Sequence, residues 1–266
     1  MTSALRTLGC SGGIGLGLST TAFLLDQDIL IDAGTGVGDL TLDELKSINH
    51  IFLTHSHLDH ICGVPLIADT VGASREGPIL VYGTTTTLDA LQKHILNDII
   101  WPDFTVIPSQ SKPFIRLVPI EIGKPVNINH REIVAIPVKH SIPANGYTIT
   151  SGSGNTIIFS GDTGPCQEFW STANQTPNLK HLIVETSFSD AEEKLALISS
   201  HFSPRLLFED LKHFKQNNTQ LWITHLKPDD GARTFNEITQ HIRAFQTDST
   251  SYLLPKKLTK DTTLTF

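Results

Sequence analysis

Four side chains that commonly bind metal ions fall within six consecutive residues, in the segment Thr54-His55-Ser56-His57-Leu58-Asp59-His60. This segment follows the apolar run Ile51-Phe52-Leu53, which predicts a buried β-strand. In an extended chain, the His-x-His spacing places two imidazoles on one side. Asp59 and His60 follow where the chain turns, so they can point at a neighbouring position. A single helical zinc motif would space its histidines at i and i+4, whereas this pattern fits a two-metal site.

Three further metal-binding side chains stand at the ends of predicted strands: His140, Asp162 and His225. Together with the first cluster they supply seven nitrogen and oxygen ligands, enough for two ions that share a carboxylate. Ligands of this kind suit zinc well, and manganese or iron tolerably. Two neighbouring metal ions lower the pKa of a shared water and bind phosphoryl oxygens. The predicted cofactor is therefore a pair of divalent ions, with zinc preferred, and the predicted chemistry is phosphoester hydrolysis.

Two segments carry a resemblance to a known family. The run His55-Ser56-His57-Leu58-Asp59-His60 resembles the signature of the metallo-β-lactamase superfamily. Its extension through Ile61-Cys62-Gly63 resembles, more narrowly, the class II cyclic-nucleotide phosphodiesterases. The segment from Leu91 to Phe104, with its Lys93-His94 and Trp101-Pro102 pairs, resembles the same class.

The resemblance covers the chain from Leu8 to about Lys227, and every metal position of the pattern is filled. It implies that one ion is held by three histidines, the other by two histidines and an aspartate, and that a second aspartate bridges them. It also implies that Asp59 helps to orient the attacking hydroxide. The implied ligands are His55, His57 and His140 for the first ion, Asp59, His60 and His225 for the second, and Asp162 as the bridge.

Glu185 and His201 are the candidates for protonating the leaving oxygen. In the enzymes of this superfamily that hydrolyse long nucleic acids, a Glu–His pair at similar positions is thought to do so. That arrangement is resembled here by Glu185-Thr186-Ser187-Phe188 and His201-Phe202-Ser203-Pro204. A histidine held by a carboxylate keeps one tautomer and becomes more basic. The helix predicted after Ser203 would also favour a nearby phosphate. The alternative is a purely structural hydrogen bond between the two side chains.

The elements around these residues are strands first, followed by alternating strands and helices. Thr41 and Glu44 form a predicted capping box, and Ser203 with Pro204 forms a second predicted helix start. Periodicity alone indicates a mixed α/β domain. The resemblance implies an α/β (α+β) fold, a four-layer αββα sandwich like that of metallo-β-lactamases, with residues 1–266 as a single metallo-hydrolase domain. Strands are predicted at 7–10, 20–25, 29–34, 50–54, 79–82, 115–120, 133–138, 147–150, 156–160, 181–184 and 221–224, and helices at 42–48, 63–73, 87–95, 205–214 and 235–245.

Two segments near the predicted site allow more than one interpretation. The glycine-rich run from Ser11 to Gly17 is not a dinucleotide-binding loop, because such a loop is followed directly by a helix and a strand is predicted here. It is either a simple β-turn or a loop at the rim of the metal site. Trp101 and Phe104 could stack on a purine base, but packing on the core is favoured. Asp32 is expected to support the site, and Cys62 to be buried, without binding metal.

The amino-acid composition limits the classes of binding partner that we expect. The 39% apolar content indicates a globular protein with a substantial core. A net charge of −7 argues against broad nucleic-acid binding. The three scattered cysteines imply no disulfide framework, and neither a signal peptide nor a membrane-spanning run is recognised. We therefore expect a cytoplasmic protein with no membrane partner, and the resemblance suggests a homodimer.

The leading functional prediction is hydrolysis of 3′,5′-cyclic nucleotides to 5′-nucleotides, with cAMP as the preferred small-molecule substrate and cGMP as its alternative. A second hypothesis is a tRNA 3′-end processing endonuclease of the same superfamily. Those enzymes usually carry an arm between the third zinc histidine and the bridging aspartate. The separation of His140 and Asp162, 162 − 140 = 22 residues, leaves no room for it. A third hypothesis is a non-catalytic, metal-stabilised binding protein, and β-lactamase or thioesterase activity is also compatible with such a fold.

Overall fold

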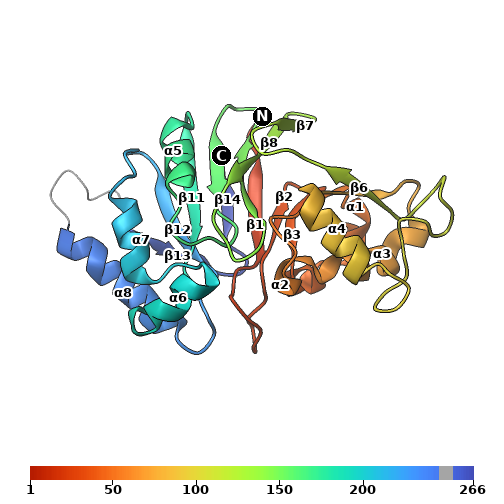
Figure 1. Cartoon of the computed structure of the whole chain (residues 1–266). Coiled ribbons are helices and arrows are strands. Elements are labelled where there is room, and N and C mark those ends of the chain that lie inside the picture. The colour runs from red at the N-terminus through yellow and green to blue at the C-terminus, as the bar shows by residue number, and fades with distance from the viewer. Residues whose placement is uncertain (246–253) are drawn as a thin grey trace.

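Two seven-stranded sheets lie face to face, with helices on both outer sides (Figure 1). The computed structural model describes residues 1–245 and 254–266. One apolar cluster fills the space between the sheets, and one further cluster lies under each helical layer. The predicted α/β class and four-layer αββα sandwich are confirmed.

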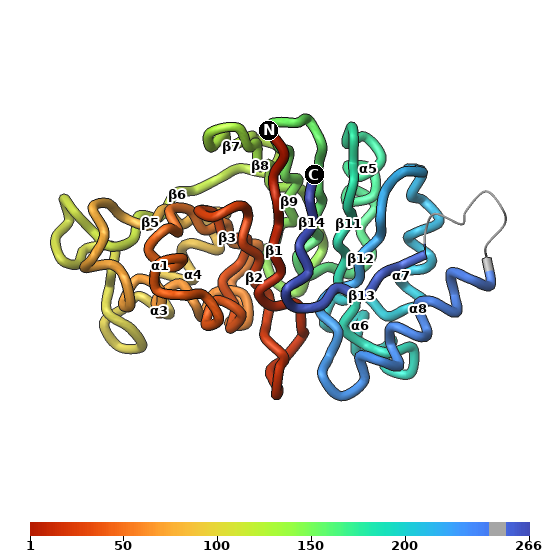
Figure 2. Tube along the Cα trace, turned by 180° about the vertical axis from the view of Figure 1, so that it is seen from behind, coloured from red at the N-terminus to blue at the C-terminus, as the bar shows by residue number. Residues whose placement is uncertain are grey.

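The first sheet joins antiparallel strands at one edge to parallel strands at the other. Figure 2 shows its C-terminal strand beside its N-terminal one, so the two ends of the chain close the same sheet. In spatial order the strands are β14 (Thr263–Thr265), β1 (Ala4–Gly9), β2 (Ala22–Leu25), β3 (Ile29–Ala33), β4 (His50–Phe52), β5 (Ile79–Gly83) and β6 (Ile115–Pro119).

The second sheet repeats this plan, with parallel strands at one edge and antiparallel strands at the other. The hairpin predicted around residues 151–155 joins two of its strands and is confirmed. The polar edge strand β7 was not predicted, because only one of its four residues is buried and it lacks a clear apolar alternation. The spatial order is β13 (Lys256–Lys257), β12 (Gln220–Thr224), β11 (Leu179–Glu185), β10 (Thr156–Phe159), β9 (Asn145–Thr150), β8 (Arg131–Pro137) and β7 (Pro125–Ile128).

Both predicted helix starts are confirmed. The Thr41 side chain accepts a hydrogen bond from the Glu44 amide, and the Glu44 carboxylate accepts one from the Thr41 amide. Ser203 caps the helix that begins at Pro204. The described helices are α1 (Leu42–Ser47), α2 (Leu58–Ile61), α3 (Gly63–Val71) and α4 (Thr85–His94) beside the first sheet, and α5 (Gln167–Gln175), α6 (Glu193–Ser199), α7 (Pro204–Leu211) and α8 (Gly231–Phe245) beside the second. Short 3₁₀ turns are η1 (Thr35–Asp39), η2 (Gly72–Ser74) and η3 (Asp190–Glu192).

Helices α5 and α6 were not predicted from the sequence. Helix α5 buries only Phe169, Trp170 and Ala173, and α6 buries only Ala196. So few apolar positions give a weak helical period. No helix in residues 1–245 and 254–266 is long and apolar enough to cross a membrane.

The loop after α4 packs against the core beneath the first sheet. The Phe104 side chain is 4% exposed within that core, and the half-buried Trp101 lies against it. This arrangement agrees with the favoured packing interpretation of these two aromatic residues.

Arg131, at the start of β8, ties the two sheets together. Its guanidinium donates two hydrogen bonds to the Asp28 carboxylate, at 2.6 and 2.9 Å, and a third to Asp26, at 3.1 Å. Both aspartates lie in the turn between β2 and β3 of the other sheet. Because the Arg131 side chain is 3% exposed, its charge depends on these carboxylates for solvation.

We expect Arg131→Met to lower the free energy of unfolding by about 3 kcal/mol, because it leaves the partly buried Asp28 carboxylate without its cationic partner and removes one from Asp26. The measurement is urea denaturation of both proteins. Lys124→Met, which breaks a solvent-exposed pair with Glu121 at the edge of the same sheet, is the matched control and should change stability little. Equal effects of the two substitutions would contradict a structural role for Arg131.

Candidate metal centre

The structure brings all seven predicted ligands together where the parallel strands of both sheets end. Two groups form, and within each group all candidate ligand atoms lie within 4.8 Å of one another. Asp162 belongs to both groups. The first group is His55, His57, His140 and Asp162, and the second is Asp59, His60, Asp162 and His225.

Local structure explains how the dense cluster after β4 reaches both groups. The chain leaves the strand through the buried residues Thr54 and His55. His57 then occupies the N-cap position of α2, a single helical turn. This turn points His60 inward, where it is fully buried, and leaves Asp59 about one-third exposed. The chain turns here as expected, and the turn is helical.

Backbone conformation at the site is unusual. His225 and Asp32 adopt the left-handed region, with φ of 61° and 57°. Such values in residues other than glycine tend to cluster at functional sites, because the surrounding structure has to hold them in place. Gly161, with φ of 61°, precedes Asp162, and a Cβ there would meet the Thr54 side chain at 3.1 Å.

In the first group, three imidazoles face one another. His55 Nε2 lies 3.0 Å from His57 Nδ1, and His140 Nε2 lies 3.2 Å from the same atom. Burial, together with the neighbouring imidazoles, lowers the pKa of His55 well below its usual value and also lowers the pKa of His57. Burial lowers the pKa of His140 as well. These neutral rings have nitrogen lone pairs available for a cation.

In the second group, carboxylates alternate with imidazoles. The Asp162 carboxylate lies 3.4 Å from His60 Nε2 and 3.4 Å from His225 Nε2, and Asp59 Oδ2 lies 3.3 Å from His225 Nε2. Burial raises the pKa of Asp162, but His225 and His60 outweigh it and hold that pKa well below its usual range. Burial lowers the pKa of His60, yet Asp162 and Asp32 keep it well above its usual value. The group therefore attracts positive charge.

The donor set fits two divalent cations. His60 Nε2 and Asp162 Oδ1 are buried and lack a hydrogen-bond partner, although buried polar atoms almost always have one. Neighbouring ligand atoms around zinc, bound at about 2.0–2.1 Å, would lie about 3.4 Å apart at the corners of a tetrahedron. The observed separations of 3.0 to 3.7 Å match this spacing.

Asp32 supports the second group from behind. Its carboxylate accepts hydrogen bonds from His60 Nδ1 at 2.7 Å and from the amide and hydroxyl of Thr54, both at 2.8 Å. Burial raises the pKa of Asp32 even though His60 opposes the shift. The carboxylate fixes the orientation of His60, as the partner of a metal-binding histidine does. This arrangement agrees with the expected supporting role.

The structure also joins Glu185 and His201. His201 Nδ1 lies 2.7 Å from Glu185 Oε1, and the His201 ring stacks on the His225 ring with centroids 5.6 Å apart. The same ring contacts His140 edge-on at 4.9 Å. Burial lowers the pKa of His201, but the Glu185 carboxylate outweighs it and raises that pKa. A histidine able to carry a proton therefore stands beside both ligand groups.

Ser187 is a site residue that sequence reasoning missed. Its hydroxyl, 1% exposed, lies 2.8 Å from His225 Nδ1, 3.1 Å from His201 Nδ1 and 3.2 Å from Glu185 Oε2. A hydroxyl has one hydrogen to donate and two lone pairs, so it can accept from His225 while it donates to Glu185. Its position two residues after Glu185 in an extended segment was an available signal, because such residues share a face.

The glycine-rich run touches the site at one point. A Cβ on Gly12 would lie 2.5 Å from the carbonyl oxygen of His225, and the Gly12 amide donates to the Leu226 carbonyl at 3.0 Å. The run therefore lies at the rim of the metal centre. Cys62 was expected to be buried but is only half-buried, because it lies between α2 and α3 near the partly exposed Asp59.

A family model described as “Beta-lactamase superfamily domain” matches residues 27–241. The crystal structure of unliganded yeast PDE1 superposes with a TM-score of 0.81 at 20% identity, covering 98% of this chain and 99% of that chain. This likeness establishes a shared fold.

Two relatives represent different activities. The 3′,5′-cyclic-nucleotide phosphodiesterase 1 of Saccharomyces cerevisiae is 28% identical over 229 residues, which cover 77% of this chain and 58% of that protein. The chain thus spans little more than half the length of that relative. A ribonuclease Z of Methanocaldococcus jannaschii is 33% identical over 101 residues, which cover 38% of this chain and 30% of that protein.

We expect Ser187→Ala to weaken the binding of zinc at the second group about 10- to 100-fold, because His225 loses the partner that orients it. Zinc affinity is measured by competition with a chromophoric chelator, starting from metal-free protein. Ser187→Thr keeps the hydroxyl and should restore most of the affinity. Unchanged affinity in Ser187→Ala, with folding verified by urea denaturation of the metal-free forms, would show that this hydroxyl does not position His225.

Proposed function

Because this chain belongs to the β-lactamase superfamily, as its metal-binding signature predicted, we propose that it is a metal-dependent phosphodiesterase that converts 3′,5′-cyclic nucleotides to 5′-nucleotides. cAMP is the proposed preferred substrate. The observation that carries the proposal is the position of the buried Asp162 carboxylate, which lies 3.4 to 3.7 Å from nitrogens of both ligand groups. The similarity to a protein named 3′,5′-cyclic-nucleotide phosphodiesterase 1 supports the choice of substrate.

In the proposed centre, each ligand group would hold one divalent ion, and Asp162 belongs to both groups. Zinc is the first choice for these nitrogen and oxygen donors, with manganese or iron as alternatives. Two such ions supply an acidified water and positive charge against the phosphoryl oxygens. Orientation of the attacking water and protonation of the leaving group are assigned to side chains of the protein.

Asp59 is proposed to orient the attacking water. Burial raises the pKa of Asp59, but the hydrogen bond with His225 and the charges of His60 and His225 together outweigh burial and hold the pKa well below the usual range. The carboxylate therefore stays ionised and can accept a hydrogen bond from water. Its side chain is 32% exposed, so a water molecule entering from solvent can reach it.

His201 is proposed to protonate the leaving O3′ atom. Hydrolysis to a 5′-nucleotide forms a new P–O bond from water and breaks the P–O3′ bond, so O3′ leaves with negative charge and needs a proton. Glu185 holds His201 Nδ1 at 2.7 Å, which leaves Nε2 as the nitrogen that can donate. The raised pKa of His201, caused by Glu185 against the effect of burial, keeps that proton available.

The tRNA-processing alternative is less well supported. The segment between His140 and Asp162 is filled by the hairpin of β9 and β10, with a turn at residues 151–155. This segment has no protruding arm that could hold a tRNA. The net charge of −7 is also unfavourable for a polyanion. The complete donor set and the adjacent Glu–His pair make a purely non-catalytic binding role the weaker hypothesis.

We expect zinc-loaded protein to convert cAMP to 5′-AMP, and chelation or Asp162→Asn to abolish turnover. Chromatography distinguishes 5′-AMP from 3′-AMP, and a parallel panel contains cGMP, a linear phosphodiester, a β-lactam and precursor tRNA. Release of 3′-AMP alone, or no turnover at millimolar cAMP, would contradict the proposal. Cleavage of precursor tRNA without turnover of cAMP would favour the second hypothesis.

We expect His201→Ala to lower turnover of cAMP by about 10²- to 10⁴-fold, the usual contribution of a general acid. Hydrolysis of bis(p-nitrophenyl) phosphate should fall far less, because p-nitrophenolate leaves without a proton. Steady-state kinetics on both substrates gives the comparison. Equal losses on both would argue against proton donation and leave His201 with a structural part only. Glu185→Gln should show the same pattern to a smaller degree.

A further inference from the structure

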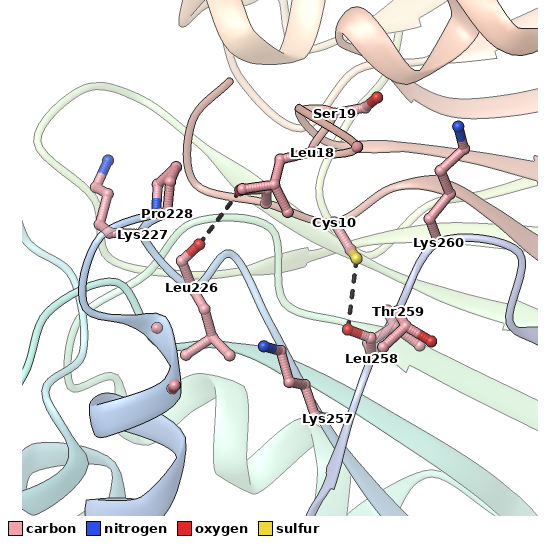
Figure 3. Close-up of a pocket in the computed structure, with 14 residues that line it drawn as sticks. Cys10, Leu18, Ser19, Leu226, Lys227, Pro228, Lys257, Leu258, Thr259 and Lys260 are labelled. Atoms are coloured by element: carbon pink, nitrogen blue, oxygen red, sulfur yellow. Dashed lines mark hydrogen bonds between the residues drawn. The ribbon is translucent and has the colours of Figure 1, made fainter. Parts of the chain in front are cut away.

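A cavity adjoins the backbone that carries His225, on the side of the C-terminal segment (Figure 3). Its volume is about 390 Å³, within the range of small-molecule sites. Four parts of the chain form its wall: the end of β1, the close of the glycine-rich run, the segment from Leu226 to the start of α8, and residues 257–260. We refer to it as the lysine pocket.

The lysine pocket has the opposite charge to the rest of the protein. Its wall contains Lys227, Lys257 and Lys260 and no aspartate or glutamate, although the chain has 27 acidic and 20 basic residues. Figure 3 shows the Lys257 ammonium directed across the pocket toward Leu226, while the other two lysines stand at its edges. The pocket is thus an electropositive site on an acidic protein, which favours anions.

The three lysines differ in how far they are neutralised. Lys257 has no carboxylate partner among the described residues. Lys227 donates to the Gly12 carbonyl at 2.8 Å and lies 5.7 Å from the centre of the Phe188 ring, which contacts His201, so its ammonium is directed to the metal-centre side of the wall. Lys260 pairs with Asp39 at 2.6 Å. Lys257 therefore carries the ammonium charge that is available to an anionic ligand in the pocket.

The rest of the wall suits a ligand with an apolar portion. Leu18, Leu226 and Leu258 contribute apolar surface, and Ser19 and Thr259 contribute hydroxyl groups. Cys10 adds no negative charge, because its thiol donates to the Leu258 carbonyl and burial raises the pKa of the thiol to about 11. The wall therefore offers an ammonium group, hydroxyl groups and apolar surface, which suit a phosphate ester with an apolar portion.

The pocket and the metal centre share one piece of backbone. The Cys10 carbonyl accepts hydrogen bonds from the His225 amide at 2.8 Å and from the Thr224 hydroxyl at 3.2 Å. The same Cys10 lines the lysine pocket. The wall of the pocket is therefore hydrogen-bonded to the segment that carries His225.

We propose that the lysine pocket binds a phosphomonoester dianion, a 5′-mononucleotide, at a site separate from the metal centre. A phosphomonoester carries about −1.5 to −2 charges near neutral pH, whereas a cyclic phosphodiester carries one, so the pocket favours product over substrate. Identifying the occupant with the reaction product rests on the proposed function, whereas binding itself does not.

The test is calorimetric titration of the zinc-loaded full chain with 5′-AMP, in which wild type should bind two molecules. Lys257→Gln should weaken one of the two binding events about tenfold or more, the loss expected for one charge-assisted contact. Lys256→Gln is the matched control, because Lys256 lies next in the same strand, packs over the Trp222 ring and does not line the pocket. It should bind as wild type does.

Two further arms identify the part of the ligand that is recognised. Inorganic phosphate should compete for the Lys257-dependent event, and adenosine should not. Equal binding by both lysine variants, a stoichiometry of one, or competition by adenosine alone would overturn the proposal. If the zinc-loaded wild type does not turn over cAMP but still shows Lys257-dependent binding of 5′-AMP, the proposed function is refuted and the binding site in the lysine pocket is not.

Discussion

The rest of the site depends on the buried carboxylate of Asp162, which requires positive charge beside it. It is 2% exposed and lies within 3.7 Å of nitrogens from His55, His60 and His225. An ionised carboxylate in such a place is costly unless positive charge lies beside it. The surrounding imidazoles can supply that charge only by taking up protons, and metal ions can supply it directly. The two-group arrangement of ligands follows from this requirement.

The fold meets the requirement by ending strands of both sheets at one place. Local devices then fix each ring: Asp32 orients His60, and the Ser187 hydroxyl orients His225 while it contacts Glu185 and His201. These hydrogen bonds connect the candidate metal ligands to the Glu185–His201 pair. Each of these two imidazoles is thus oriented by a buried side chain that itself has little room to move.

Charge is distributed unevenly over the molecule. The chain is acidic as a whole, yet the lysine pocket offers a cationic side chain to an anion, and this pocket adjoins the metal centre through the hydrogen bond between the Cys10 carbonyl and the His225 amide. Local attraction on an acidic surface favours a small anion over a long polyanion, because only a small ligand avoids the repulsion of the remaining surface. The absence of an arm between His140 and Asp162 leads to the same preference.

The sequence by itself determined what depends on neighbouring residues. The cluster from Thr54 to His60, the helix starts at Thr41 and Ser203, and the strand periods are local patterns, and a resemblance extended them to the full ligand set. Only the tertiary structure decided which groups meet. His225 and Asp59 are 166 residues apart in the sequence, yet their side chains lie 3.3 Å apart. Contacts between distant segments also decide the hydrogen bonds of Ser187, the close approach of Gly12 to His225 and the formation of α5. Packing between distant segments sets these distances, and no local period encodes them.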